Sequence, residues 1–159
     1  MTNKQYLRQY RALDARLELA LENLQRARAR AERLTSALRP DGGGGRSLGS
    51  TGDALLAAYL DEREEFEREV RELTARKKRI LRSIERLRAD CPEKAETYRA
   101  VLQAVYISGK RLPEAAEMLH YSERQLARLH GEALRCLEQV PLEQLPLGQN
   151  PRKDGRKWQ

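Results

Sequence analysis

The sequence contains few of the residues that form a large globular core or an enzyme site. Aromatic residues make up only 5% of its 159 residues, and there are two histidines and two cysteines. No paired carboxylates, nucleophile with a base or set of metal ligands can be assembled from its motifs. We therefore expect no enzyme, no cofactor and no metal site.

Long apolar runs are also absent. No stretch approaches the length of a membrane span, and the N-terminus MTNKQYLRQYRA lacks the apolar core of a signal peptide. Cys91 and Cys136 have neither metal-ligand spacing nor a nearby histidine pair, so we expect two reduced thiols with a structural role. These features predict a cytoplasmic protein without a membrane partner.

Charged residues, by contrast, are abundant in the sequence. Charged residues make up 35% of the chain, and 31 Lys and Arg against 24 Asp and Glu leave a net charge of +7. A chain rich in Ala, Glu, Leu and Arg is typical of long helices and predicts an all-α fold. The positive balance favours an anionic partner.

Two segments carry sustained heptad repeats, which predict coiled-coil helices over residues 4–39 and 53–91. In the second segment, Arg63 and Lys77 occupy seam positions. The apolar seam residues are Tyr6, Tyr10, Leu13, Leu17, Ala20, Leu24, Ala27, Ala31, Leu34 and Leu38, followed by Leu56, Tyr59, Phe66, Val70, Leu73, Ile80, Ile84 and Leu87.

Between these segments lies PDGGGGRSLGSTG, residues 40–52, which we expect to end the first helix and reverse the chain. A phosphate-cradling loop is a remote alternative, because no Gly-Lys-Ser/Thr sequence follows the glycines.

The charges predict that the two helices pair antiparallel within one chain. Residues 26–39 hold five arginines and one glutamate, a balance of +4, whereas residues 40–75 hold four arginines and nine acids, a balance of −5. An antiparallel hairpin over residues 1–91 sets these stretches side by side. Parallel pairing in a dimer, the less favoured alternative, would set each stretch beside its own copy.

Residues 110–139 have the spacing of small and apolar residues that is typical of a helix-turn-helix. Pro113 suits the first turn of the first helix, and Ser122 suits the N-cap of the second. His120 falls at the turn, where a positive φ is expected. The apolar contacts between the helices are assigned to Ala115, Ala116, Leu119, Tyr121, Leu126 and Leu129. An ordinary helical hairpin in a core is the alternative.

The second helix of this unit predicts the function. Leu126, Leu129, Ala133, Leu134 and Leu137 form its buried stripe. Arginine can bind guanine bidentately and glutamine can do the same for adenine, so a polar outer face is suited to a major groove. A solvated helix face is the alternative for any one of these residues. We expect base readout by Ser122, Glu123, Arg124, Gln125 and Arg128.

Phosphate binding is expected from a second stretch. Residues 110–139 hold five basic residues and five glutamates, whereas residues 76–88 hold seven basic residues and one acid. Phosphate contacts supply much of the affinity for DNA. Residues 76–88 would therefore supply the positive charge that residues 110–139 lack. It could equally contact an acidic protein surface or remain solvated. The expected phosphate contacts are Lys110, Arg111, Arg135, Arg76, Lys78, Arg79, Arg82 and Arg86.

Asp90-Cys91-Pro92 should end the long second helix, because proline disfavours helix in the residue before it. Residues 93–107 should form a support helix that packs through Tyr98, Val101, Leu102, Val105 and Tyr106 and ends at Ser108-Gly109. The expected helix-turn-helix domain spans 92–140. It is small, and docking on the coiled coil or a second chain would help it fold. Residues 141–159 should form a disordered basic tail.

SERQLARLHGEALRCL resembles the recognition helix of bacterial sigma factor region 4. The longer stretch YRAVLQAVYISGKRLPEAAEMLHYSERQLARLHGEAL is similar to small phage-encoded regulators with a sigma region-4-like domain behind a long helical segment. The resemblance covers most of residues 1–139 and implies a role in transcription of phage late genes. It departs from the sigma pattern at Pro113, Ala115, Glu123, Arg124, Gln125 and Ala127, so we do not expect a standard promoter element as target.

Three functions fit this sequence. The first is a sequence-specific double-stranded DNA-binding transcription regulator associated with the bacterial nucleoid, which uses its coiled coil to form a homodimer or higher oligomer or to contact RNA polymerase. The second is a DNA-packaging subunit of the small-terminase kind, assembled as a ring. The third is an adaptor that binds RNA polymerase without reading DNA.

Overall fold

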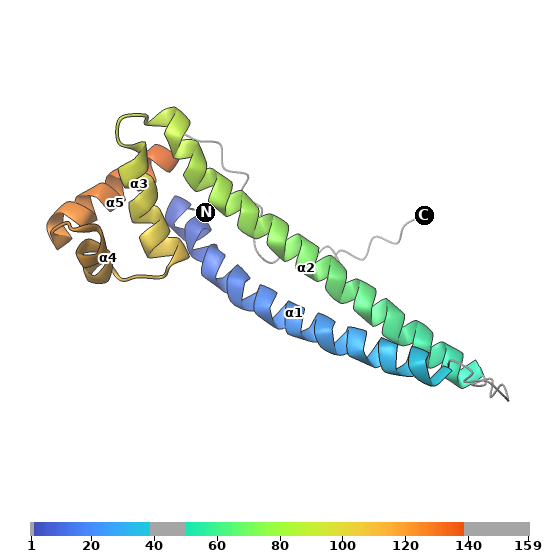
Figure 1. The fold of residues 1–159 in the computed structure, drawn as a ribbon. Helices are drawn as coiled ribbons and strands as arrows, with labels where there is room; N and C mark the ends of the chain where they lie inside the picture. Colours follow the sequence, from blue (N-terminus) through green and yellow to red (C-terminus); the bar gives the residue numbers. More distant parts are fainter. Residues whose placement is uncertain (1, 39–49, 139–159) are drawn as a thin grey trace. The chain divides into compact units, whose positions relative to one another are not determined.

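The protein is all-helical in the computed structural model, which describes residues 2–38 and 50–138. Within these ranges there is no strand, so the predicted all-α class is confirmed. The elements in chain order are α1 (Asn3–Leu38), α2 (Ser50–Asp90), α3 (Ala95–Leu102), the π-helical turn η1 (Gln103–Ile107), α4 (Leu112–Leu119) and α5 (Glu123–Glu138) (Figure 1).

The ends of the long helices follow the sequence closely. α2 ends at Asp90, as the following Cys91-Pro92 predicts, and the Cys91 N–H still donates to the Leu87 carbonyl at 3.0 Å. Its start differs, because α2 begins at Ser50 and the last three residues of the expected 40–52 turn are helical. Asp53 in the first turn favours this earlier start, since an acid is stabilised near a helix N-terminus. Residues 40–49 and the expected tail, 141–159, lie outside the described residues.

The chain divides into two compact units, and the division does not follow the expected boundary at residue 91. The hairpin unit comprises residues 12–78. The terminal unit comprises residues 1–11 and 79–159, of which 2–11 and 79–138 are described. The first turns of α1 and the last turns of α2 therefore belong with α3, α4 and α5.

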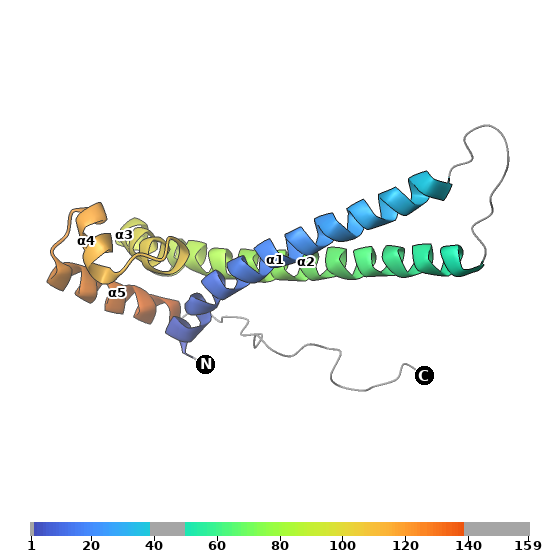
Figure 2. The same cartoon turned by 90° about the horizontal axis from the view of Figure 1, so that it is seen from below.

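In the hairpin unit, α1 and α2 run antiparallel, as their charges predict (Figures 1 and 2). Successive positions along α1 pair with positions in reverse order along α2, and the distances are 3.6 Å for Arg16–Glu69, 3.1 Å for Arg28–Glu67 and 3.2 Å for Arg30–Glu62. Lys77, the expected seam lysine, pairs with Asp14, and the Arg30 guanidinium lies 5.8 Å from the centre of the Tyr59 ring. Each exposed pair contributes about 0–1 kcal/mol, so together they bias orientation more than stability.

The apolar seam of the hairpin unit is also as expected. Its fully buried members are Leu13, Ala20, Leu24, Ala27, Ala31 and Leu73. Tyr59, Phe66 and Val70 on α2 are half-buried, because two helices alone cannot enclose large side chains on all sides. Arg63, the other expected seam cation, is half-buried, with its Nε 3.8 Å from Glu67.

The core of the terminal unit draws on every helix. The first turns of α1 and the last turns of α2 contribute to it, and Leu7 from α1 and Leu87 from α2 are fully buried. The Asn3 amide donates to the Leu134 carbonyl at 3.4 Å, which joins α1 to α5. The other large buried side chains are Tyr6, Ile80, Ile84, Tyr98, Val101, Leu102, Tyr106, Leu126, Leu129 and Leu137.

The support helix differs from the expected regular helix over 93–107. α3 ends at Leu102 and continues as the π-helical turn η1, in which the Ser108 N–H donates to the Gln103 carbonyl at 2.9 Å, five residues back. The wider turn changes which side chains face inward. Tyr106 is buried as predicted, whereas Val105 is only half-buried. The segment ends at Gly109, whose φ is +69°.

Candidate nucleic-acid interface

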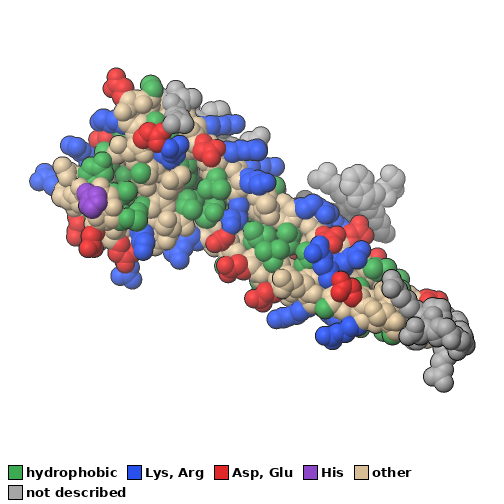
Figure 3. All heavy atoms as spheres, viewed as in Figure 1, with side chains coloured by type: hydrophobic (Ala, Val, Ile, Leu, Met, Phe, Trp, Pro, Cys, Tyr) green, Lys and Arg blue, Asp and Glu red, His purple; other side chains and the backbone are tan. Residues whose placement is uncertain are grey.

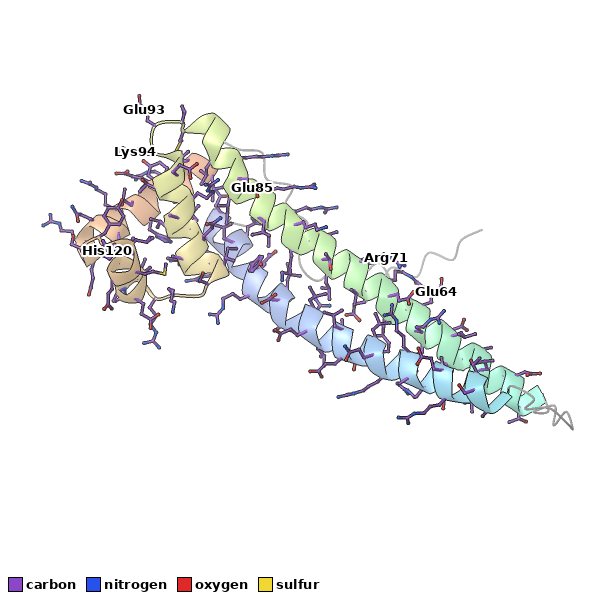
Figure 4. The ribbon with its side chains drawn as sticks, in the orientation of Figure 1. Glu64, Arg71, Glu85, Glu93, Lys94 and His120 are labelled. Carbon is purple, nitrogen blue, oxygen red and sulfur yellow. A yellow bond between two sulfur atoms is a disulfide. The ribbon has the colours of Figure 1, made fainter. Side chains whose placement is uncertain are left out.

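The candidate interface is built on α4 and α5, two helices joined by a short turn. α4 begins after Arg111, whose N–H donates to the Glu114 carboxylate at 2.9 Å, and Pro113 lies in its first turn, as predicted. It ends at His120, which adopts φ 59° and ψ 40°, the left-handed conformation expected at this turn. The Tyr121 N–H donates to the Ala116 carbonyl at 2.9 Å and closes the turn. Figure 4 labels His120 between the two helices.

α5 begins with a reciprocal cap. The Ser122 hydroxyl accepts from the Gln125 N–H at 3.2 Å, and the Gln125 side-chain carbonyl accepts from the Ser122 N–H at 3.1 Å. Ser122 is thus the predicted N-cap. Gln125 also receives a structural task that the sequence analysis did not assign to it, because its amide oxygen is occupied by the cap.

The two faces of α5 separate as the spacing predicts. Leu126, Ala133 and Leu137 are fully buried, Leu129 is 8% exposed and Leu134 is half-buried. The predicted readout residues Ser122, Glu123, Arg124, Gln125 and Arg128 are all exposed, and so is Arg135, a predicted phosphate contact. The outer face is therefore accessible.

Packing at the turn differs in part from the expectation. Ala115 and Ala116 are buried and let α4 approach α5 closely. Tyr121, in contrast, is 37% exposed, so only part of its side chain can take part in the expected helix contact. Leu119 is half-buried and Met118 is 47% exposed. Of the residues assigned to this contact, Ala115, Ala116, Leu126 and Leu129 are thus buried as predicted.

Glu132 links the outer face of α5 to α3, and the sequence analysis missed it. Its carboxylate accepts from the Tyr98 hydroxyl at 2.9 Å and lies 3.8 Å from the Lys94 ammonium and 3.7 Å from Nε of Arg128. The Tyr98 hydrogen bond holds the pKa of Glu132 below its usual value, with the cations adding to that effect. The negative charge of Glu132 therefore offsets part of the charge of Arg128. The spacing of Arg128 and Glu132 alone could have revealed this pair.

His130 has a structural position on the flank of α5. Its Nε2 lies 3.0 Å from the Tyr106 hydroxyl, and the two rings stack with centroids 5.7 Å apart. Burial lowers the pKa of His130, and the charges of Lys4 and Arg8 lower it further. Burial also raises the pKa of the Tyr106 hydroxyl.

Cys91 and Cys136 form a disulfide, so the expectation of two free thiols is wrong. Their Cα atoms are 6.7 Å apart, within the range that a disulfide spans. The bond joins the segment after α2 to the last turn of α5, 45 residues apart in sequence. Sequence spacing carried no signal for it, because only the packing of α5 in the terminal unit brings the cysteines together.

Apart from Arg135 on α5, the predicted phosphate-binding residues lie in three places. Lys110 and Arg111 are exposed just before α4. In the terminal unit, the exposed Arg82 and Arg86 project from the side of α2 opposite the buried Ile80. The other three also lie on α2. Arg79 is half-buried in the terminal unit. In the hairpin unit, Arg76 is half-buried and Lys78 is exposed.

Other kinds of site find no support in the described ranges. No group of three or more His, Cys, Asp or Glu side chains within 2–38 and 50–138 could hold a metal ion. Of the helices that the structure describes, none has the length and apolar character needed to cross a membrane. Figure 3 shows Lys and Arg side chains mixed with Asp and Glu on the visible surface. Comparison with protein-family models, curated proteins and solved structures finds no match to the chain.

Proposed function

We propose that the protein is a sequence-specific double-stranded DNA-binding transcription regulator. The observation that carries this proposal is the geometry of α4 and α5: two short helices joined by a left-handed turn at His120, with Arg124 and Arg128 exposed on the second helix. A helix of this kind can enter the major groove N-terminus first, with its long polar side chains reaching base edges.

The electrostatics of the unit support a division of tasks. Residues 110–139 hold equal numbers of basic and acidic residues, and Glu132 offsets part of the charge of Arg128. Most of the attraction to phosphate must then come from other residues, and residues 76–88 carry a balance of +6. In this proposal Arg124 reads bases, whereas Arg79 and Arg82 bind the DNA backbone.

Selection of bound fragments from a random duplex pool tests the proposal, because it assumes nothing about the target sequence. The full chain should retain a recurring sequence at moderate salt. Arg124→Ala should relax the preference at particular positions, whereas Arg79→Ala with Arg82→Ala should weaken binding to all sequences alike. Arg71→Ala, and Arg68→Ala with Arg71→Ala, at exposed positions in the hairpin unit, are the matched losses of one and two charges and should change neither.

Two further parts of the proposal concern assembly and location. We propose that the coiled coil supports a homodimer or higher oligomer, or contact with RNA polymerase, and that the protein acts at the nucleoid of a phage-infected or lysogenic bacterium. Disulfides are rare in the reducing bacterial cytosol, so the bond between Cys91 and Cys136 counts against this location. Molecular mass in solution separates a regulator of two or four protomers from a packaging ring of eight or more.

One observation favours the adaptor as a second candidate. Met118 and Tyr121 are exposed beside the turn, where apolar side chains suit a protein partner. An adaptor would bind RNA polymerase while retaining no preferred sequence from the random pool, which distinguishes it from the regulator.

A further inference from the structure

The first turns of α1 combine a buried side with a basic side. Asn3, Tyr6 and Leu7 are buried in the terminal unit. Lys4, Arg8 and Arg11 are exposed and follow one another at intervals of four and three residues, which places them along one side of the helix. Residues 1–11 contain no acidic residue. We call these three cations the α1 basic stripe.

One end of the stripe lies beside α5. The Asn3 side chain donates to the Leu134 carbonyl, and Lys4 and Arg8 lie close enough to His130 to lower its pKa. His130 and Leu134 are half-buried and lie on a flank of α5 turned away from Arg128, about 160° and 120° around a helix of about 3.6 residues per turn. The stripe therefore adjoins the flank of α5 that is turned away from Arg128.

The other end of the stripe meets the start of α4. A Cβ built on Gly109 would lie 2.7 Å from Cζ and 2.8 Å from Nε of Arg11, so the guanidinium rests directly on the glycine backbone. Gly109 is followed by Lys110 and Arg111, both exposed. Together the stripe and these two residues form a continuous basic ridge from the flank of α5 to the N-terminus of α4.

The ridge is not neutralised within the described part of the chain. None of its five cations forms an ion pair with an acidic side chain in residues 2–38 or 50–138, whereas Arg128 on α5 does. Exposed cations without acidic partners can neutralise phosphates, and this releases the counterions condensed on a polyanion.

We propose that the α1 basic stripe binds the phosphodiester backbone of duplex DNA along the edge of the groove that α5 enters. This proposal rests on the proposed function and deepens it by assigning backbone contacts to the N-terminal turns of the chain. In this proposal, α1 contacts the same stretch of DNA backbone as Lys110 and Arg111. The basic side of α2 faces away from the buried side of the unit, whereas the stripe lies on the same turns of α1 as Asn3, which is hydrogen-bonded to α5.

The salt dependence of DNA binding by the full chain tests the stripe. The variant Lys4→Gln, Arg8→Gln, Arg11→Gln removes three charges and leaves the buried side of α1 unchanged. Fluorescence anisotropy with a labelled duplex over a range of KCl concentrations gives the slope of log K against log salt. The slope should be lower by about 0.9 for each phosphate that is no longer neutralised, or about 2.7 for three. Affinity should fall equally for selected and random duplexes.

Two controls define the outcome. Arg33→Gln, Arg68→Gln, Arg71→Gln removes the same charge from exposed positions in the hairpin unit and should leave the slope unchanged. Lys4→Arg, Arg8→Lys, Arg11→Lys keeps the charge and should retain the wild-type slope, which shows that the charge and not the identity of each side chain is responsible; helix content by circular dichroism checks that the glutamine variant is folded.

The results separate the two proposals. A wild-type slope in the glutamine variant overturns the stripe while the proposed function stands, and it leaves an acidic protein as the partner of this surface. An equal reduction in the hairpin control also overturns it, because net charge would then be responsible. Failure of the wild-type chain to bind any duplex at low salt overturns the proposed function together with the stripe.

Discussion

Reduction of the bond between Cys91 and Cys136 should lower the stability of the terminal unit by an amount that can be worked out from its span. The cysteines are 45 residues apart, and the loop closed by the bond contains α3, α4 and most of α5. Loop entropy for that length gives about 4 kcal/mol at 25 °C, at the upper end of the usual range for native disulfides. With an m value of about 2 kcal/mol/M, the urea midpoint should fall by about 2 M.

The assay must distinguish the terminal unit from the hairpin unit, because both are helical. Hydrogen exchange at increasing urea, read by mass spectrometry for peptides of α5, follows the terminal unit alone. The oxidised chain is compared with the chain in dithiothreitol. The Cys91→Ser, Cys136→Ser variant is the control, since the reductant should not change its midpoint. Equal midpoints for the oxidised and reduced chains would refute the loop-entropy reasoning, and two free thiols in the unfolded, unreduced chain would refute the bond.

Three further predictions concern single positions in the terminal unit. Gly131→Ala should raise the free energy of unfolding by about 0.5–1 kcal/mol, because a Cβ there meets nothing within 4 Å and glycine weakens a helix interior. Gly109→Ala should lower it by about 1–2 kcal/mol in the same urea assay, because its φ of +69° is strained for alanine and Arg11 must move. Burial lowers the pKa of His130, so the unfolded chain binds its proton first as the pH falls below the ordinary value of 6.5, and stability is lost there. His130→Gln should flatten this loss below pH 6.5, and an unchanged slope in urea midpoints would contradict it.

Local sequence signals predicted the helices and their ends well. Cys91-Pro92 marks the end of α2 at Asp90, and Ser122 marks the start of α5, because both act on the backbone of their immediate neighbours. The antiparallel pairing of α1 with α2 was also predictable, since the opposite charge blocks that meet, as in Arg28–Glu67, favour it over parallel pairing in a dimer.

Features that depend on packing between distant segments were not predictable in the same way. The heptad repeat of α1 continues through Arg11 without a change, so nothing in it separates the turns that join the terminal unit from those of the hairpin unit. Glu132 receives the Tyr98 hydroxyl only because α3 packs on α5. The outer residues of α5 were found from periodicity alone, since facing solvent requires no partner.

The core of the terminal unit explains why α1 begins before, and α2 ends after, the residues of the hairpin unit. α3, α4 and α5 together are too short to bury a sufficient core, and Leu7 and Leu87 supply the missing apolar surface from both long helices. A helix that packs by one side must present its other side to solvent, and in α1 that side carries Lys4, Arg8 and Arg11. The segment that completes the core is thus the same segment that provides cations beside α5. Because the two tasks use different sides of one helix, substitutions on the exposed side can test DNA binding without disturbing the fold.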